Sequence, residues 1–300
     1  MLVLKPIRHD TIWGGPRIST FTETKGDSIG HLYSVFCREE MSNEILNGTH
    51  RGELLNDVFP LFKKDVGMEE YPFFPLTLAL TEADLNLSVQ VHPDDRTAQK
   101  IEGKKRGKRE SWYFIEAPTE GYIINGCTCK DKKQVRELLD QQKYLEILDT
   151  LPVKQGDYVF VEPGTLHSIT AGSLVYEIEE GADSTYRFYD YDRTDAQGNK
   201  RDLHIEKAYL TLDTEKKSVA KQYQKGQEII EKTYATEKLD NISSYRNETE
   251  DLICFTLIHG RALCDGVEVT PGMTVLLFPG EEIDDMSCEL AFTARLLREE

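Results

Sequence analysis

Cysteine is scarce in this sequence of 300 residues, which contains six cysteines and no Cys-x2-Cys motif. The one close pair, Cys127-x-Cys129, is a weak signal by itself, so a cysteine-rich zinc module is excluded. A chain of this length buries enough apolar surface to need no disulfide bonds. We therefore expect reduced thiols and a cytoplasmic protein.

Long apolar runs and an excess of positive charge are also missing. No apolar stretch approaches the roughly 20 residues that span a membrane, and residues 1–5 lack the apolar core of a signal peptide. The 36 Lys and Arg residues against 53 Asp and Glu residues give a net charge of −17. This charge argues against a general nucleic-acid-binding protein. It still allows a phosphorylated metabolite, which needs only a local positive pocket.

The stretch 89–92 carries the first functional signal. Its two valines alternate with Gln90 and His92 as in a β-strand, so both polar side chains leave the same face, about 7 Å apart. Glu110 opens an aromatic-rich strand, and His167 follows a Pro-Gly turn. Two imidazoles, a carboxylate and an amide oxygen suit a borderline divalent cation. The sequence therefore predicts a mononuclear metal site.

Charged residues flank this stretch. Asp94 and Asp95 follow a proline and precede a helix-like segment, so we favour helix capping over metal ligation for them. The segment 104–109 holds five cations in six residues, which is more typical of a solvated loop than of a nucleic-acid patch. It leads directly into the predicted strand. If Glu110 is a ligand, Lys108 shares its face and must lie near the metal.

Short predicted strands between Gly and Pro turns indicate antiparallel β-barrels or jelly rolls. Helical spacing occurs in 48–64, where Pro60 interrupts it, and in 131–148. Segment 156–164 also has a weak repeat at 272–280, with Gly and Pro seven residues apart in both. The second copy has isoleucine at the position that corresponds to His167, so we expect one metal site.

In combination these motifs resemble the bacterial type I mannose-6-phosphate isomerases, which are bicupin zinc enzymes. The matching segments, which lie within roughly residues 5 to 212, are Trp13-Gly14-Gly15, Val89 to Asp95, Gly107 to Glu110, the turn to His167, Asp183 to Arg187 with Tyr189-Asp190, and Leu203 to Glu206. The resemblance implies a mainly β fold of two cupin-type jelly-roll β-barrels with a few covering helices. It implies a metal-binding domain over residues 1–213, with helical insertions, and a degenerate C-terminal cupin domain over 214–300 without metal.

The same resemblance implies that Gln90, His92, Glu110 and His167 bind one Zn²⁺ ion per chain. The implied reaction interconverts mannose 6-phosphate and fructose 6-phosphate through a metal-stabilised cis-enediol or enediolate. We therefore expect an aldose-ketose isomerase whose partner is a small hexose phosphate. We expect it to be a monomer or a weak homodimer, bound to neither nucleic acid nor membrane.

Three further positions match the family's acid/base and charge-stabilising groups, namely Lys108, Asp183 and Arg187. A guanidinium is no base in neutral water, so Arg187 is assigned to enediolate or phosphate stabilisation. For the proton transfer, Lys108, Asp183 and a metal-bound water remain open. A lysine beside a metal ion is expected to have a lowered pKa, which would make it a credible base.

Two residues are candidates for substrate binding. Ser88 lies on the face of Gln90 and matches a family position that contacts phosphate, although its hydroxyl could equally be satisfied within the sheet. Trp13 could form a pocket wall or cap a hydrophobic core, and the sequence favours neither.

The chain departs from the family pattern at three places. It has Glu179-Glu180 for the usual Gln-Gln, Ala79 for a lysine, and Gly-His-Leu-Tyr at 30–33 for Gly-Glu-x-Trp. The loss of the lysine leaves the basic loop, Ser88 and Arg187 to supply charge for a phosphate. Two alternatives stay open. One is a metal-dependent cupin enzyme of another class, acting on a different sugar or as an iron-type dioxygenase, because a set of two histidines and one carboxylate can also hold iron. The other is a non-catalytic sugar-binding or regulatory cupin, which the acidic pair and Ala79 motivate.

Overall fold

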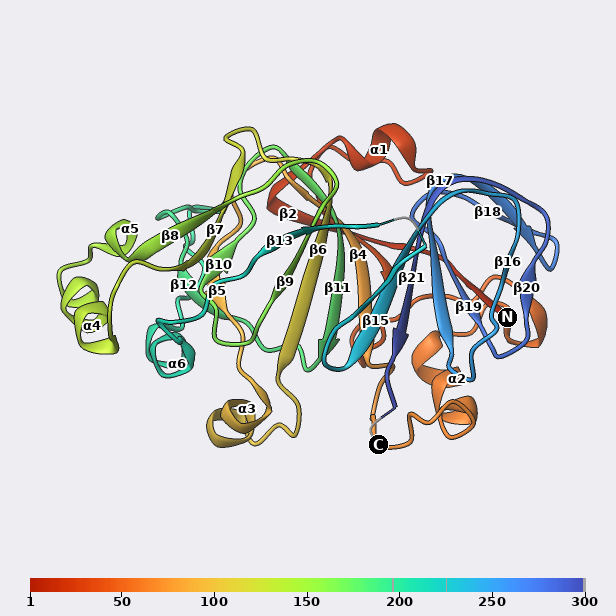
Figure 1. The fold of residues 1–300 in the computed structure, drawn as a ribbon, viewed down its shortest axis with the longest axis horizontal. Coiled ribbons are helices and arrows are strands. Elements are labelled where there is room, and N and C mark those ends of the chain that lie inside the picture. Colours follow the sequence, from red (N-terminus) through yellow and green to blue (C-terminus); the bar gives the residue numbers. More distant parts are fainter. Residues whose placement is uncertain (196, 225, 299–300) are drawn as a thin grey trace. The chain divides into compact units, whose positions relative to one another are not determined.

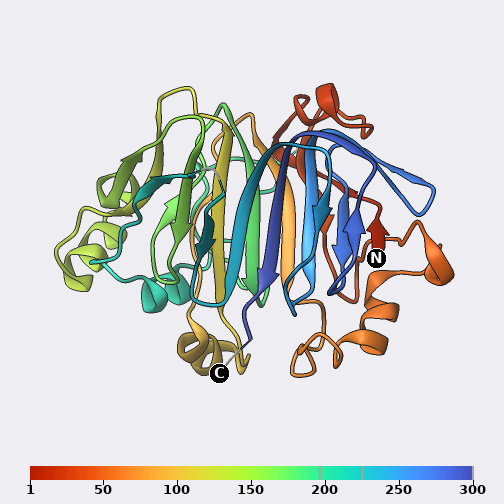
Figure 2. The ribbon, with the colours of Figure 1, turned by 45° about the vertical axis from the view of Figure 1, so that its right-hand side comes forward.

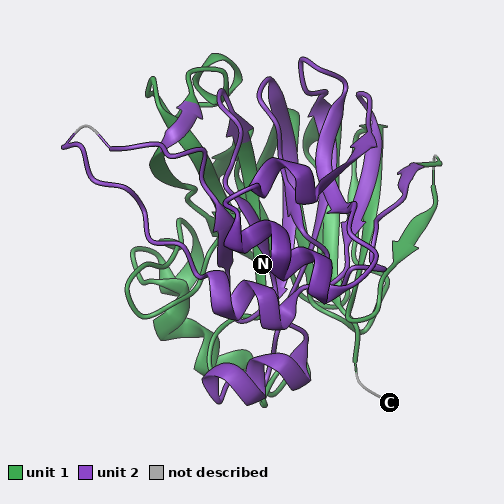
Figure 3. Ribbon diagram, turned by 90° about the vertical axis from the view of Figure 1, so that its left-hand side faces the viewer, with its two compact units in different colours: residues 1–11, 15–81, 223–300 green, residues 12–14, 82–222 purple. Residues whose placement is uncertain are grey.

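The computed structural model describes residues 1–195, 197–224 and 226–298. Its elements are mainly strands paired in antiparallel sheets, which confirms the predicted fold class. The chain forms two compact units, coloured separately in Figure 3: unit 1 contains residues 1–11, 15–81 and 223–300, and unit 2 contains residues 12–14 and 82–222. This division differs from the expected boundary at residue 213, and the two cupin domains stay a prediction. In the described part of the chain, no helix is long and apolar enough to cross a membrane.

Unit 1 is built largely of strands from the two ends of the chain. Its elements are β1 (Leu2–Leu4), β2 (Ile7–Gly15), α1 (Ile18–Phe21), β3 (Ile29–Val35), a 3-10 helix (Gly48–His50), α2 (Leu55–Phe62), β4 (Leu76–Ala83), β14 (Glu228–Ile230), β15 (Tyr234–Ile242), β16 (Tyr245–Arg246), β17 (Ile253–Cys264), β18 (Val267–Val269), β19 (Thr274–Leu277), β20 (Glu282–Ile283) and β21 (Met286–Leu296). The last two residues of β4 and Ile12–Gly14 near the end of β2 belong to unit 2.

The main sheet of unit 1 has the strand order β1-β19-β17-β21-β15-β14, and β18 pairs with β17. Figures 1 and 2 show the long strands β15, β17 and β21, in blue tones, side by side. The apolar residues of this sheet include Phe255 and Leu257 on β17 and Val275 on β19, which are fully buried in one core cluster. The predicted repeat at 272–280 contains β19, and Gly272 before it adopts a positive φ of 89°. Burial of this apolar face stabilises the sheet.

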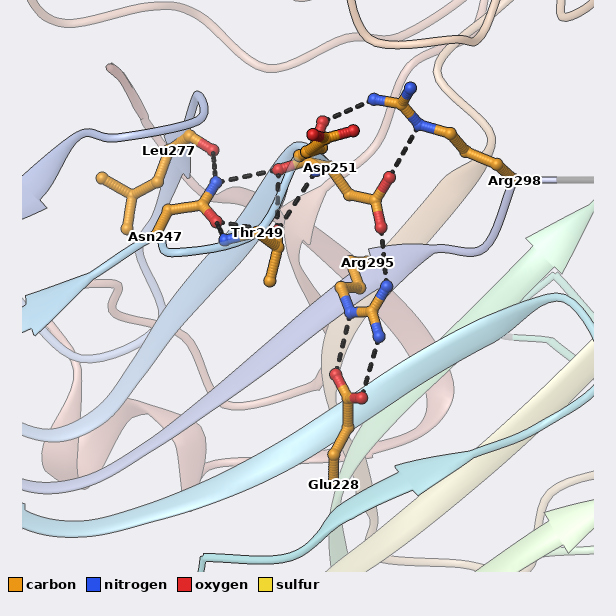
Figure 4. Close-up of polar contacts among 8 residues, drawn as sticks. Glu228, Asn247, Thr249, Asp251, Leu277, Arg295 and Arg298 are labelled. Atoms are coloured by element: carbon orange, nitrogen blue, oxygen red, sulfur yellow. Dashed lines mark hydrogen bonds and ion pairs between the residues drawn. The ribbon is translucent and has the colours of Figure 1, made fainter.

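A polar network closes one end of this sheet (Figure 4). Arg295 on β21 binds both carboxylate oxygens of Glu228 at 2.8 Å and one oxygen of Asp251 at 2.6 Å. The side chain of Asn247 is fully buried and donates to the carbonyl oxygens of Asp251 and Leu277. The Asn247 contacts satisfy the backbone carbonyl groups of Asp251, which lies in a loop, and of Leu277, the last residue of β19.

Unit 2 carries the predicted functional residues. Its elements are β5 (Val89–Val91), α3 (Asp95–Glu102), β6 (Lys108–Glu116), β7 (Tyr122–Cys127), α4 (Lys132–Asp140), α5 (Tyr144–Ile147), β8 (Leu148–Pro152), β9 (Asp157–Val161), β10 (His167–Ser168), β11 (Ser173–Gly181), β12 (Tyr186–Tyr189), α6 (Ile205–Thr211) and β13 (Ala220–Gln222). Strands β12-β5-β10-β7-β8 form one sheet, and β13-β9-β6-β11 lie side by side in another.

Two apolar clusters define the layers of unit 2. One cluster contains Trp112 from β6, Val159 from β9 and Ile123 from β7, and therefore lies between the two sheets. The other joins Val89 and Val91 of β5 to the helices α4, α5 and α6, which cover the outer face of the five-stranded sheet (Figures 1 and 3). Because successive side chains of a strand alternate between faces, Gln90 points inward between the sheets.

The helices of unit 2 match the helices predicted from the sequence only in part. The side chain of Asp94 accepts a hydrogen bond from the Thr97 amide, which confirms its capping role at α3, and Asp131 caps α4 in the same way. The predicted helix over 131–148 is wrong in extent, because the chain breaks at Gln142, whose φ is 57°. Leu145, which lies beyond the break, in α5, is exposed.

Candidate metal centre

The predicted ligands meet between the two sheets of unit 2. His167 on β10 is the cross-strand partner of Gln90 on β5, so both side chains belong to the same sheet. Glu110 lies on β6, in the other sheet. His92 directly follows β5. Ligand atoms of His92, Glu110 and His167 all lie within 4.8 Å of one another.

Backbone carbonyl groups orient both imidazoles. Nδ1 of His92 donates to the carbonyl oxygen of Ser184 at 2.9 Å, and Nδ1 of His167 donates to that of Thr165 at 2.8 Å. In a neutral ring the proton is then on Nδ1, and Nε2 carries a free lone pair. The Nε2 atoms face Glu110, at 2.9 Å for His92 and 3.4 Å for His167.

The ring nitrogens and carboxylate oxygens that meet at this centre are buried and lack hydrogen-bond partners within the described part of the chain. Among the described residues, Nε2 of His92, Nε2 of His167 and both carboxylate oxygens of Glu110 have no hydrogen-bond partner. All three residues are at most 1% exposed. Buried polar atoms without partners are costly, and two lone pairs facing a carboxylate fit a cation between them. The donor set therefore fits a borderline divalent metal ion.

Protonation states agree with this donor set. Burial lowers the pKa of His167 to about 4, so the ring is neutral at pH 7. Burial alone would raise the pKa of Glu110, but His92 and Lys108 outweigh it, and the pKa lies well below its usual range. A neutral imidazole and an ionised carboxylate are the forms that bind metal.

Lys108 lies beside the centre, as predicted from its place on the face of Glu110. Its Nζ atom lies 2.7 Å from Oε1 of Glu179 and 3.3 Å from Oε2 of Glu110. Burial works to lower its pKa, but the carboxylates of Glu179 and Glu110 raise it well above the usual value. The protein's own charges thus act against the expected lowering, and the ammonium form is the stable one.

The remaining predicted residues lie at different depths. Arg187 on β12 is half-buried, pairs across the strands with Gln90, and donates from Nη1 to the Asp202 carbonyl at 2.8 Å. Asp183 is exposed in the loop between β11 and β12. After Glu179 and Glu110, its negative charge also helps to raise the pKa of Lys108.

The two predicted substrate-binding residues are buried. The hydroxyl of Ser88 lies 3.5 Å from Oε1 of Gln90. Trp13 packs with Trp112 in the cluster between the sheets. Their roles toward a substrate stay predictions.

Two glutamates near the centre were not identified as site residues from sequence. Glu179 is directly opposite Glu110 on β11, and Glu177 is opposite Trp112, whose Nε1 donates to Glu177 at 3.0 Å. Oxygen atoms of Glu110, Glu177 and Glu179 all lie within 4.8 Å of one another. The alternation of Glu177 and Glu179 was visible, but their pairing with β6 depends on the register of distant strands.

The sequence is similar to curated mannose-6-phosphate isomerases. It is 33% identical over 213 residues to mannose-6-phosphate isomerase ManA of Bacillus subtilis, covering 71% of this chain and 68% of the relative. It is 34% identical over 213 residues to the mannose-6-phosphate isomerase of Streptococcus mutans, covering 70% of this chain and 67% of the relative. The matched stretches thus span about two thirds of these relatives. No protein-family model matches the chain.

Solved structures share the fold along the whole chain. The mannose 6-phosphate isomerase from Bacillus subtilis superposes with a TM-score of 0.80 at 24% identity, and the match covers 99% of both chains. A variant of phosphomannose isomerase from Salmonella typhimurium gives a TM-score of 0.72 at 11% identity, again over 99% of both chains. At these identities the likeness concerns the fold alone.

Proposed function

The chain belongs to the mannose-6-phosphate isomerase family, and we propose that it interconverts mannose 6-phosphate and fructose 6-phosphate. The observation that carries the proposal is the set of four buried atoms on His92, Glu110 and His167 that have no hydrogen-bond partner among the described residues. Gln90 would complete the set, because its side chain points into the same space as His167. We assign one zinc ion per chain to these four residues.

A metal ion bound here would act as a Lewis acid that polarises the substrate carbonyl and favours the enediolate. The chain supplies further positive charge around that centre. The Lys108 ammonium, 3.3 Å from Glu110, can donate a hydrogen bond to an oxygen on which negative charge develops. Arg187, across from Gln90, can hold the enediolate or the phosphate group.

The proton transfer needs a base near the sugar carbons. Because the Lys108 ammonium is stabilised by Glu179 and Glu110, Lys108 suits the role of hydrogen-bond donor. Asp183 is the better base of the two residues, since its carboxylate is exposed on the loop that leads into β12. Ser88 and Trp13 are proposed to contact the substrate, the former at the phosphate.

The remaining proposals concern the protein in the cell. We place it in the cytoplasm, where hexose phosphates occur, as a monomer or a weak homodimer. Light scattering across a concentration series tests the oligomeric state.

A sugar-binding protein without catalysis is the second candidate. It is favoured by Ala79, which stands where the family pattern has a phosphate-binding lysine, and by the acidic pair Glu179-Glu180. Metal analysis of the purified protein, followed by a coupled assay with mannose 6-phosphate, separates the candidates. One zinc per chain with turnover supports the isomerase. Metal without turnover on any hexose phosphate supports the second candidate, and bound iron points to another enzyme class.

A further inference from the structure

Three carboxylates share one face of the β6–β11 pair. Glu110 on β6 is directly opposite Glu179 on β11, and Glu177 lies two residues from Glu179 on the same face. One oxygen of each lies within 4.8 Å of the others. Like charges at opposite positions of a strand pair repel, so this arrangement needs a positive partner.

Lys108 contacts two members of this cluster, Glu110 and Glu179. Its side chain is 6% exposed, and its shortest contact, 2.7 Å, is to Glu179. The residue opposite Lys108 on β11 is Gly181, which offers no side chain in the way. Lys108 therefore reaches diagonally to Glu179 while its Nζ stays 3.3 Å from Glu110.

Glu179 is the accessible member of the cluster. Its side chain is 19% exposed, against 1% for Glu110, and Glu177 is 5% exposed as a residue. Glu177 is also bound by Trp112. Of the three carboxylates, Glu179 is thus the least covered by protein. Its charge would act most strongly on an incoming sugar.

On the basis of the proposed isomerase function, we propose that Glu179 is a positioning and specificity residue. It holds the Lys108 ammonium beside Glu110, and it cancels the charge of that ammonium toward an incoming phosphorylated sugar. Three carboxylates and one ammonium carry a net charge of −2. A bound divalent ion brings this group to zero, which leaves it no net attraction for an anion.

A change of Glu179 to glutamine would give the metal-loaded group one positive charge. Attraction for a phosphorylated sugar should then rise on the order of tenfold at low salt, whereas a neutral sugar should bind as before. The glutamine carbonyl oxygen can still accept a hydrogen bond from Lys108, so the ammonium would lose a charged partner but keep an acceptor at this position. If Glu179 had only a structural role, its substitution would change the affinities for the phosphorylated sugar and for the neutral sugar alike.

The experiment compares E179Q, E179D and E180Q in the zinc-loaded protein by calorimetry with two inert probes, mannitol 6-phosphate and mannitol. E180Q is the matched control, because Glu180 lies on the opposite face of β11 and binds Arg109 at 3.1 Å. Metal content and thermal unfolding are measured for each variant. Turnover of mannose 6-phosphate gives kcat and KM.

We expect E179Q to bind mannitol 6-phosphate about tenfold more tightly than the wild type does, with mannitol unchanged. E179D keeps the charge but is one methylene shorter. Its ratio of affinities for mannitol 6-phosphate and mannitol should therefore match that of the wild type, while its kcat falls. E180Q should keep the wild-type ratio. An unchanged ratio in E179Q, or an equal change in E180Q, overturns the inference about Glu179 while wild-type turnover still supports the isomerase. A wild-type protein that neither binds the probes nor turns over mannose 6-phosphate overturns the proposed function and this inference with it.

Discussion

Glu110 and Glu179 are directly opposite each other on β6 and β11, and the Lys108 ammonium contacts both. Two carboxylates in these positions repel, and burial makes the repulsion stronger because the surrounding dielectric is low. Lys108 therefore stabilises the fold of unit 2 in addition to any part in the reaction. The two roles can be measured separately, one as the stability of the fold and the other as turnover.

The change Lys108→Met keeps the volume of the side chain and removes its charge. We expect the metal-free variant to lose about 3 kcal/mol of unfolding free energy, because buried carboxylates lose their counter-charge. Zinc should recover part of this loss, since a divalent ion supplies positive charge at Glu110. Turnover should fall on the order of 10² or more with metal retained. Urea unfolding with and without zinc, and kcat, measure these effects. A variant with normal turnover would show that Lys108 has no part in the reaction.

Replacing His167 by alanine should release the metal and abolish turnover. His167 is fully buried, and its Nε2 has no hydrogen-bond partner among the described residues, so the metal is the partner that its geometry suits. His50→Ala is the matched control, because His50 belongs to unit 1 and its Nδ1 atom lies 3.2 Å from Oε2 of Glu53. Metal content per chain is measured by mass spectrometry. If the His167 variant retained one tightly bound metal per chain, the ligand assignment would be wrong.

The sequence predicted the central strand because its information is local. Alternation at 89–92 placed Gln90 on the inner face, and the acid before α3 indicated a cap. Glu110 and His167 were joined to this strand by ligand type and by the family resemblance, because the strands that carry them are far apart in the chain. The sequence did not reveal the pairing of β6 with β11, so the effect of Glu179 on Lys108 was missed. In the metal-free protein burial works to lower the pKa of Lys108 but Glu179 and Glu110 raise it, whereas the expected lowering concerned a lysine beside a bound metal ion and stays a prediction. Register is set by long-range packing and not by local pattern.

Acid should destabilise the metal-free protein through His167. Its pKa is about 4 in the folded protein and about 6.5 when unfolded, so between these values the unfolded chain binds more protons. Stability therefore falls as the pH drops from 6.5 to 4, by about 2 to 3 kcal/mol from this residue. Urea unfolding of chelator-treated wild type and His167→Asn at pH 7.5 and pH 4.5 isolates the contribution. Equal losses in both proteins would mean that His167 is not held neutral by burial.

Asn247 should be a main contributor to the stability of unit 1. Its buried amide donates to the carbonyl oxygens of Asp251 and Leu277 at 2.8 and 2.9 Å, and its oxygen accepts from both the amide and the hydroxyl of Thr249 (Figure 4). Asn247→Ala would leave these buried groups without partners, so we expect a loss of about 2 to 4 kcal/mol in urea unfolding. The exposed neighbour Glu248 provides the control, since Glu248→Ala should change stability by less than about 0.5 kcal/mol. Equal effects of the two substitutions would show that water replaces the Asn247 amide, and that the network in Figure 4 is not what fixes this loop.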